Sequence, residues 1–491
     1  MILIWMIGIL LAGGILCWLA AQWFPVLAKW IALLTVIADM ALACTFFVVY
    51  KTFPHSDNSW FIDYQVNWIP SLGISLHLAL DGLSIVLLLL TFFLGILAVL
   101  CSWNEIKEKT GFYFFNLLWT LAGISGVFVA MDLFLFYFCW EIMLVPMYFL
   151  IIIWGDTNRR YAAYKFFIFT QAGSLFLLLA ILALYFIHGQ QTNNYTFDYF
   201  SLLKTVLEPT TEKWIMLGFL IAFVIKLPMI PFHNWLPDAH SEAPTAGSLI
   251  LAGLLLKTGA YGILRFVLPM FPEAAASIAW WAMLLGVIGI VYGALLAFAQ
   301  TDLKRLIAYT SVSHMGFVLV GIFSFNEIAM QGVVMQILTH GISTGALFVM
   351  AGMLKERLHT RDITKMGGLW TSMPAMGGVA ILFTMASSGL PLLGNFIAEF
   401  FILLGTFNIN TTLSVIASVG LVLSALYSLR MMQQVFMGQP ATTTTVKDIS
   451  ARELIIMVAL SISIVALGLY PQPVMDTVQH LSFTIHPLLH E

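Results

Sequence analysis

The sequence predicts an all-α integral membrane protein with about 14 transmembrane helices, and three observations lead to that fold class. Of the 491 residues, 61% are hydrophobic and 9% are charged, whereas about 25% are charged in ordinary globular proteins. The apolar residues form runs of about 20, the length that crosses a bilayer as a helix. Runs such as Leu87-Leu88-Leu89-Leu90 do not alternate with polar residues, which excludes a transmembrane β-barrel.

Each predicted helix is an apolar run bounded by charged, Pro, Gly or other turn residues. In chain order the runs cover residues 2–22, 26–50, 75–101, 111–131, 133–153, 161–188, 213–235, 245–265, 275–300, 303–324, 327–354, 375–406, 409–436 and 453–470. We expect helices 1–3 to form an N-terminal segment (1–110) and helices 4–8 a first five-helix repeat (111–265). Helices 9–13 then form a second, inverted repeat (275–436), and helix 14 and the tail occupy 437–491.

Helices 7 and 12 are predicted to be broken within the membrane. Helix 7 contains Pro228 and Pro231 directly after Lys226, and each proline removes a hydrogen bond from the helix. Helix 12 is too long for one straight crossing and contains the segment SSGLPLLG (387–394) at its middle. Two broken helices five spans apart are typical of a transporter built from two inverted repeats. The alternative is that the prolines only kink two packed helices.

The basic residues predict the orientation in the membrane. Thirteen Lys and Arg residues fall in the odd-numbered loops and four in the even-numbered loops. Because cytoplasmic loops carry the excess of Lys and Arg, the odd loops are expected in the cytoplasm and both termini in the periplasm. The chain opens on Met1-Ile2-Leu3-Ile4 without a basic segment or a small-residue cleavage site before Trp23, so we expect the first helix to be retained.

Composition and spacing also exclude several function classes. The net charge is -3 and no basic block occurs, so nucleic acid is not expected as a partner. No two of the 36 glycines are two residues apart, which excludes the GxGxxG dinucleotide fingerprint. The four cysteines contain no CxxC pair, so the ligand patterns of zinc and iron–sulfur sites are missing. No metal or cofactor site is therefore predicted in this chain.

Four charged residues fall deep inside predicted helices: Glu141, Lys226, Lys257 and Glu399. A charge at a helix centre costs about 2.5–3.5 kcal/mol on insertion scales, so such residues usually have a function. Burial raises the pKa of a carboxylic acid and lowers the pKa of a lysine, so both can titrate near neutral pH. A proton relay requires groups that titrate in this range. The sequence therefore predicts a relay through these groups. The alternative for Glu141 and Lys226 is a static buried ion pair that fixes helix packing.

Two histidines within helices, His314 and His340, are candidates for the same relay, because imidazole exchanges protons near neutral pH. The alternative for each is a hydrogen-bonded core histidine. Four further charged residues within or near spans are expected to be structural or interfacial: Asp39, Asp81, Lys29 and Lys165.

His233 and His240 flank a polar, Pro-bounded stretch that we expect to be a cytoplasmic loop. They could ligate a metal or haem, as in a haem-carrying membrane oxidoreductase. However, two haem ligands would have to project from facing helices. We therefore expect a capping and packing role for this loop.

Two motifs resemble a known family. The first runs from Lys226-Leu227-Pro228 through Pro231-Phe232-His233 and Trp235-Leu236-Pro237-Asp238-Ala239-His240 to Ala243-Pro244-Thr245. The second comprises residues 302–311, DLKRLIAYTS, and 313–316, SHMG. Both resemble the antiporter-like subunits of respiratory complex I, the NADH:quinone oxidoreductase, and of multisubunit cation/proton antiporters. The resemblance covers roughly residues 75 to 435.

The resemblance implies a proton-translocating subunit in the membrane arm of an enzyme complex. It implies that Glu141 tunes Lys226, that Lys257 and His314 pass the proton on, and that Glu399 gates the periplasmic side. Glu399 stands where two sibling subunits carry a lysine, and no long lateral helix follows the fourteenth span. FMN, iron–sulfur clusters and quinone are then expected in other subunits, with the two sibling subunits and phospholipid as partners. The expected location is a bacterial inner membrane. The alternative is a subunit of an autonomous sodium/proton antiporter.

Overall fold

The computed structural model describes residues 2–52, 60–439 and 446–478. The predicted tail beyond residue 478 lies outside these residues. The first six membrane helices are α1 (Ile2–Ala20), α2 (Pro25–Thr52), α3 (Gly82–Glu105), α4 (Thr110–Val129), α5 (Leu133–Trp154) and α6 (Arg159–Thr192). All six are long and apolar enough to cross a membrane.

The middle of the chain contains the first broken span. This part of the chain contains six helices in order: α7 (Tyr199–Leu202), α8 (Pro209–Lys226), α9 (Trp235–Glu242), α10 (Thr245–Ile250), α11 (Leu256–Gly262) and α12 (Leu268–Met270). Two π-helical turns, Leu251–Leu255 and Ile263–Val267, join α10, α11 and α12 into one continuous crossing of residues Thr245–Met270.

The second half consists of α13 (Pro272–Ala299), α14 (Leu303–Phe323), α15 (Glu327–Leu358), α16 (Leu369–Ser372), α17 (Pro374–Ser387), α18 (Gly394–Ile409), α19 (Thr411–Phe436), α20 (Ala451–Leu469) and α21 (Gln472–Val478). Twelve crossings in the described part of the chain are long and apolar. The broken helices α8 and α17/α18 complete the predicted set of about fourteen. The predicted breaks in helices 7 and 12 are confirmed, since α8 ends at Lys226 and residues 388–393 separate α17 from α18.

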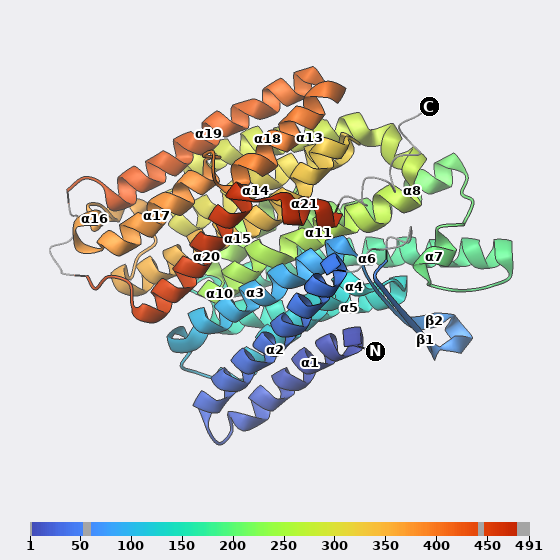
Figure 1. Cartoon of the computed structure of the whole chain (residues 1–491), viewed down its shortest axis with the longest axis horizontal. Coiled ribbons are helices and arrows are strands. Elements are labelled where there is room, and N and C mark those ends of the chain that lie inside the picture. Colours follow the sequence, from blue (N-terminus) through green and yellow to red (C-terminus); the bar gives the residue numbers. More distant parts are fainter. Residues whose placement is uncertain (1, 53–59, 440–445, 479–491) are drawn as a thin grey trace.

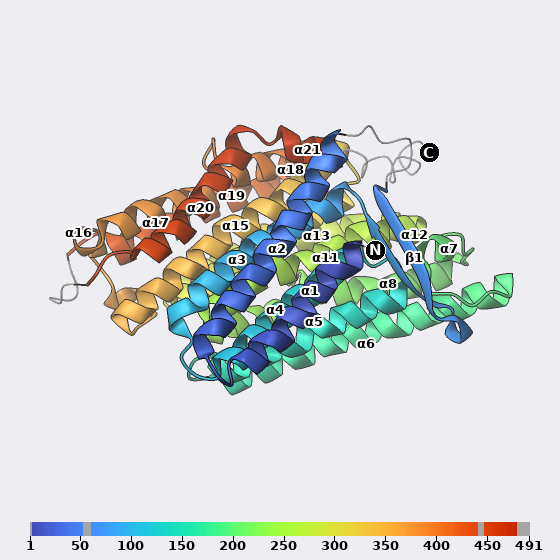
Figure 2. The same ribbon diagram turned by 60° about the horizontal axis from the view of Figure 1, so that its bottom comes forward.

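Figure 1 shows the helices running roughly parallel to one another, with α1 at one edge and α19 at the opposite edge. In Figure 2 the long helix α6 lies along a third side of the bundle. The central helices α10–α12, α14 and α15 are almost wholly buried. The deepest part of the molecule is therefore made by α10–α12, α14 and α15.

An antiparallel β-hairpin interrupts the all-helical pattern. Strands β1 (Ile62–Ile69) and β2 (Ile74–Leu80) pair from Ile62 opposite Leu80 to Ile69 opposite Ile74. The predicted start of helix 3 at residue 75 is wrong, because residues 74–80 form β2 and the helix begins at Gly82. We call the end of the bundle that carries this hairpin the hairpin face.

Aspartates begin the corresponding helices of the two halves at opposite ends of the bundle. Asp132 caps α5 on the hairpin face and forms a backbone bridge with Asp198. Asp302 caps α14 on the other face and forms the same kind of bridge with Asp362. One local pattern on opposite faces is what inverted repeats produce. The domain limits given above remain a prediction.

Helix α21, the last in the described part of the chain, packs on the N-terminal helices. The carbonyl of Thr477 accepts a hydrogen bond from the hydroxyl of Tyr50, at 3.3 Å. It also lies so close to Gly82 that a Cβ at that position would be 1.8 Å away. The last described helix therefore closes against α2 and α3.

Candidate functional site

The first predicted pair, Glu141 and Lys226, lies in the first half of the bundle. Lys226 is the last residue of α8, directly before the break, and is 1% exposed. Its ammonium lies 5.0 Å from the centroid of the Trp140 ring, a cation–π distance. The carboxylate of Glu141 interacts with Tyr137, one turn earlier on α5. Within the described residues neither Oε1 of Glu141 nor the ammonium of Lys226 has a hydrogen-bond partner, so no direct hydrogen bond joins these two atoms.

Close backbone packing brings α8 and α11 together. A Cβ on Gly259 would lie 2.6 Å from the carbonyl oxygen of Phe223 and 3.1 Å from the Cβ of Lys226. Only glycine allows this approach. It places Lys226 and Lys257 on adjoining segments of the two crossings.

Lys257 lies between the two π-helical turns and is fully buried. Its ammonium donates to the carbonyl of Ala252, at 2.9 Å, and contacts Nδ1 of His340, at 2.5 Å. π-Helical turns are frequent at functional sites. Here the carbonyl that receives the ammonium belongs to one of these turns. The structure thus gives Lys257 a histidine partner in the second half of the chain.

His314 and Glu399 continue from this pair. The rings of His340 and His314 have centroids 5.6 Å apart. Nδ1 of His314 lies 2.8 Å from Oε1 of Glu399, which also accepts from Nε2 of Gln336 at 3.3 Å. These side chains come from α14, α15 and α18, and each is buried. Four of the six predicted relay residues therefore form one row, which we call the relay row: Lys257, His340, His314 and Glu399.

Two hydroxyl groups that the sequence did not point to lie beside His314 in the relay row. The hydroxyl of Tyr427 lies 3.1 Å, and that of Ser387 3.3 Å, from Nε2 of His314. Neither residue is charged, and serine and tyrosine are common in membrane helices, so no sequence signal distinguished them. Gln336, an amide within an apolar helix, was detectable by the same criterion as the charges.

The stretch around His240 is not the cytoplasmic loop that we expected. Residues 235–242 form α9, and His240 is fully buried with its ring stacked 4.4 Å from that of Phe348. His233 packs against the ring of Tyr292, with centroids 5.9 Å apart. The polar stretch folds inward because its neighbours are the buried starts of α10 and α14. Both histidines have the packing role that we expected, but the stretch is a buried helix and not a loop.

Two basic residues at the ends of predicted spans, Lys304 and Arg265, were counted with the adjoining loops but are also buried. Lys304 is 1% exposed and donates to the carbonyl of Ala243, at 2.7 Å. Arg265 is 6% exposed and pairs with Asp81, which caps α3. These assignments were wrong because residues near the end of a span can turn inward.

The other weak candidates have mainly structural contacts. Lys165 pairs with Asp238 at 2.6 Å, and Lys29 donates to the carbonyl of Trp103 at 2.5 Å. Asp39 is fully buried on α2, and neither of its carboxylate oxygens has a hydrogen-bond partner among the described residues. It lies outside the relay row.

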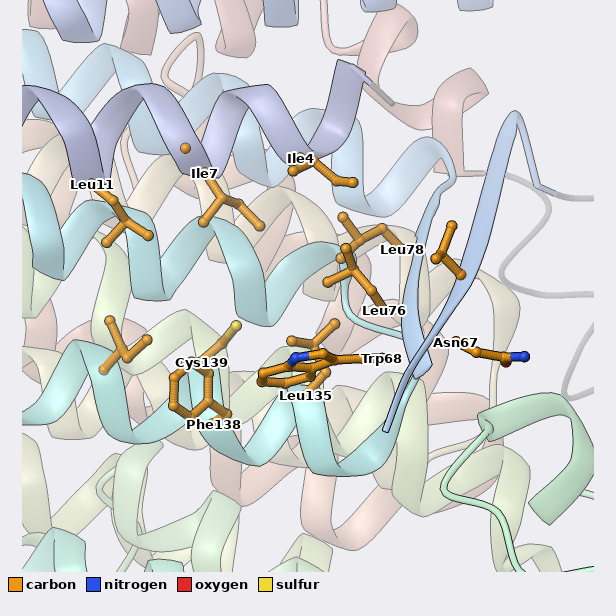
Figure 3. Close-up of a pocket in the computed structure, with 13 residues that line it drawn as sticks. Ile4, Ile7, Leu11, Asn67, Trp68, Leu76, Leu78, Leu135, Phe138 and Cys139 are labelled. Atoms are coloured by element: carbon orange, nitrogen blue, oxygen red, sulfur yellow. The ribbon is translucent and has the colours of Figure 1, made fainter. Parts of the chain in front are cut away.

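An apolar cleft of about 350 Å³ lies between α1, the hairpin and α5. Figure 3 shows Ile7 and Leu11 on one side, facing Phe138 and Cys139 on the other, with Trp68 of β1 between α5 and the hairpin. Among the described residues, no charged side chain lines this cleft. The relay row is therefore separate from this cleft.

Comparison with known proteins agrees with the fold and with the motifs. The family described as NADH:quinone oxidoreductase/Mrp antiporter, TM, matches residues 130–424. The NADH-quinone oxidoreductase subunit M of Pseudomonas aeruginosa is 52% identical over 97% of this chain and 96% of its own.

Two solved structures are similar over nearly the whole chain. A chain of respiratory complex I from Thermus thermophilus with bound NADH has a TM-score of 0.87 and 27% identity, covering 98% of this chain and 99% of that one. A chain of the Mrp complex from Dietzia sp. has a TM-score of 0.86, covering 98% and 96%, and its 21% identity makes it a likeness of fold. This multi-pass membrane protein thus belongs to the NADH:quinone oxidoreductase/Mrp antiporter family, in the group of NADH-quinone oxidoreductase subunit M.

Proposed function

We propose that this chain is a proton-translocating subunit in the membrane arm of NADH:quinone oxidoreductase. It moves protons from the cytoplasm to the periplasm while quinone is reduced elsewhere in the complex. The observation that carries the proposal is the relay row, in which a buried lysine, two histidines and a glutamate lie in sequence. The 52% identity to a subunit M supports the assignment to this complex.

Each step along the relay row joins a proton donor to an acceptor. The ammonium of Lys257 donates to Nδ1 of His340, so this contact can carry the first transfer. Transfer between the two imidazole rings uses one bridging water, which can connect polar groups too far apart for a direct bond. When a proton reaches Nε2 of His314, the proton on Nδ1 can pass to Glu399. The ring then remains neutral with its proton on the other nitrogen.

Titratable groups outside the relay row control how protons enter it, and the break in helix 12 lies where they leave it. Glu141 lies near enough to Lys226 to influence its charge electrostatically, so loading of Lys226 depends on the state of Glu141. Lys304 and His240 are buried on the side opposite the hairpin face, and they suit the uptake of protons from the cytoplasm. Glu399 lies beside the break in helix 12, where its Oε2 would be 3.1 Å from a Cβ on Gly389. That break suits release to the periplasm.

In this proposal, other subunits of the complex carry out the electron transfer. FMN, the iron–sulfur clusters and quinone are bound by other subunits, and this chain holds no redox centre. Its partners are the two sibling antiporter-like subunits and phospholipid. The excess of Lys and Arg in the odd loops supports an orientation with both termini in the periplasm. The similarity to a bacterial subunit M supports an inner-membrane location.

The test measures proton pumping driven by NADH in membrane vesicles that contain the intact complex. Glu141→Gln, Lys226→Ala and Glu399→Gln should each reduce pumping by at least about tenfold, which is a change of about 1.4 kcal/mol in the barrier. The amount of assembled complex on a native gel should stay the same. Normal pumping by assembled Lys226→Ala and Glu399→Gln complexes would refute the proposal.

The autonomous sodium/proton antiporter is the second candidate, because the matching family includes Mrp antiporters. Purification from native membranes distinguishes the two. Co-purification with a flavin- and iron–sulfur-containing assembly supports the complex I subunit, whereas an assembly of small membrane proteins without cofactors supports the antiporter.

A further inference from the structure

His314 faces two hydroxyl groups with the ring nitrogen that points away from Glu399. Nε2 lies 3.1 Å from the hydroxyl of Tyr427 and 3.3 Å from that of Ser387. Tyr427 is 1% exposed and Ser387 is 2% exposed. The two hydroxyls come from different elements, because Tyr427 lies on α19 and Ser387 is the last residue of α17.

The chemistry of Nε2 alternates during proton transfer, and this makes the hydroxyls important. An ionised carboxylate can only accept, so the proton of a neutral His314 lies on Nδ1, facing Glu399, and Nε2 must accept a hydrogen bond. In the imidazolium, and in the neutral ring that has passed its Nδ1 proton to Glu399, the same Nε2 is a donor. A hydroxyl can donate or accept by rotating its hydrogen, with no movement of heavier atoms. Tyr427 and Ser387 can therefore remain bonded to His314 in both states.

We propose that Tyr427 and Ser387 are positioning residues that act as alternative hydroxyl partners for Nε2 of His314 and keep its Nδ1 directed at Glu399 as the ring gains and loses protons. This inference rests on the proposed proton-relay function. It adds that the two hydroxyls are redundant, because two groups share one nitrogen. Loss of either leaves the nitrogen with a partner, and loss of both leaves it buried and unsatisfied.

The redundancy predicts a non-additive double mutant. The rate of NADH-driven pumping, divided by the amount of assembled complex, is measured for Tyr427→Phe, Ser387→Ala and the double variant. Each single variant should keep the rate within about threefold of the wild type. The double variant should fall about tenfold further than the product of the two single effects, as expected for coupled residues in contact. Additive effects would overturn the proposal.

The chain offers a matched control pair. Tyr113 and Ser102 form another buried tyrosine–serine contact, with their hydroxyl oxygens 2.8 Å apart and no histidine between them. Tyr113→Phe, Ser102→Ala and their combination should leave the pumping rate per complex within about threefold. An equal loss in this pair and in the Tyr427/Ser387 pair would mean that removal of any buried hydroxyl causes the defect, and would also overturn the proposal.

A second comparison covers the case in which the double variant does not assemble. Thr and Val have nearly the same shape, and only Thr carries a hydroxyl. In the Tyr427→Phe background, Ser387→Thr should therefore pump at least about fivefold faster than Ser387→Val, and equal rates would overturn the proposal. Glu399→Gln is measured in parallel. If this variant pumps normally, the relay function itself fails; if it is inactive while the two hydroxyls behave additively, only the present inference fails.

Discussion

The β-hairpin is held to the helices through His77, and its attachment should depend on pH. Nδ1 of His77 lies 2.6 Å from Asp198, and Nε2 lies 2.7 Å from Asp63. Only the imidazolium donates from both nitrogens, so both carboxylates are satisfied when His77 is charged. Burial by itself lowers the pKa of His77, but the hydrogen bonds to Asp198 and Asp63 together outweigh it and raise the pKa above its ordinary value.

His77 and Asp198 lose their stabilising effect on the hairpin at opposite ends of the pH range. Because the pKa of His77 is raised by folding, its contribution is complete below about pH 6.5 and is lost as the pH rises through the folded value. Burial raises the pKa of Asp198, but hydrogen bonds from His77 and Ser201 outweigh it and lower the pKa. Its contribution is therefore present above about pH 3.9 and is lost as the pH falls through the folded value. The hairpin should be held most tightly between these limits.

The structure sets the size of the effect. The contact with Asp198 is largely buried, and a hydrogen bond to a charged group contributes about 1.5–3 kcal/mol. The side chain of Asp63 is 56% exposed, so that contact contributes only about 0.2–1 kcal/mol. His77→Gln should therefore weaken hairpin attachment by about 2 kcal/mol. That figure corresponds to about 30-fold more frequent opening, since about 1.4 kcal/mol is a factor of ten.

Hydrogen exchange on the purified complex provides the measurement. The amide of Met131 donates to the carbonyl of His77, so it reports on attachment directly. At pH 6, its exchange, corrected for the intrinsic rate, should be about 30-fold faster in His77→Gln. At pH 9 the difference should narrow, while Asp63→Asn should have little effect at either pH. A His77→Gln difference of the same size at both pH values would refute the reasoning.

Two other substitutions, each with a control variant, test the packing of the helices. Gly259→Ala places a Cβ 2.6 Å from a backbone oxygen of α8, so it should sharply reduce assembled complex on a native gel; Gly378→Ala, with no atom within 4 Å of its Cβ, should not. Arg357→Gln breaks the bonds to Glu453 at 2.7 and 2.9 Å that join α15 to α20, and should cost about 2 kcal/mol in thermal unfolding. Lys365→Gln, at a 71% exposed side chain, should change the stability by less than about 0.5 kcal/mol. A normal level of complex in the first case, or equal thermal shifts in the second, would contradict these contacts.

Hydropathy located the buried charges because the cost of placing a charge in the membrane depends on depth, which follows directly from position in a span. It could not identify their partners. Lys257 contacts His340, 83 positions away, and that pairing depends on which faces of α11 and α15 meet. Pairing of this kind is a property of the folded bundle.

The errors have physical causes of the same sort. Residues 75–80 were assigned to helix 3 because they adjoin its long apolar run. The alternation of Leu76, Leu78 and Leu80 with smaller or polar residues is the period-2 pattern of a strand and was the signal that could have separated them. The stretch around His240 resembles a loop because it is polar and bounded by prolines, yet its neighbours bury it. The breaks in helices 7 and 12 were predictable because proline acts on the local backbone wherever it stands.

The contact of Thr477 with Tyr50 and Gly82 has a consequence for biosynthesis. Tyr50 and Thr477 are 427 positions apart in the chain. At about 5–20 residues per second, the ribosome takes roughly 20 to 85 seconds to make the intervening segment. During that interval the surfaces of α2 and α3 that α21 later covers must be occupied by lipid or by an insertion factor. The N-terminal helices thus enter the membrane first but are among the last to acquire their complete set of neighbours.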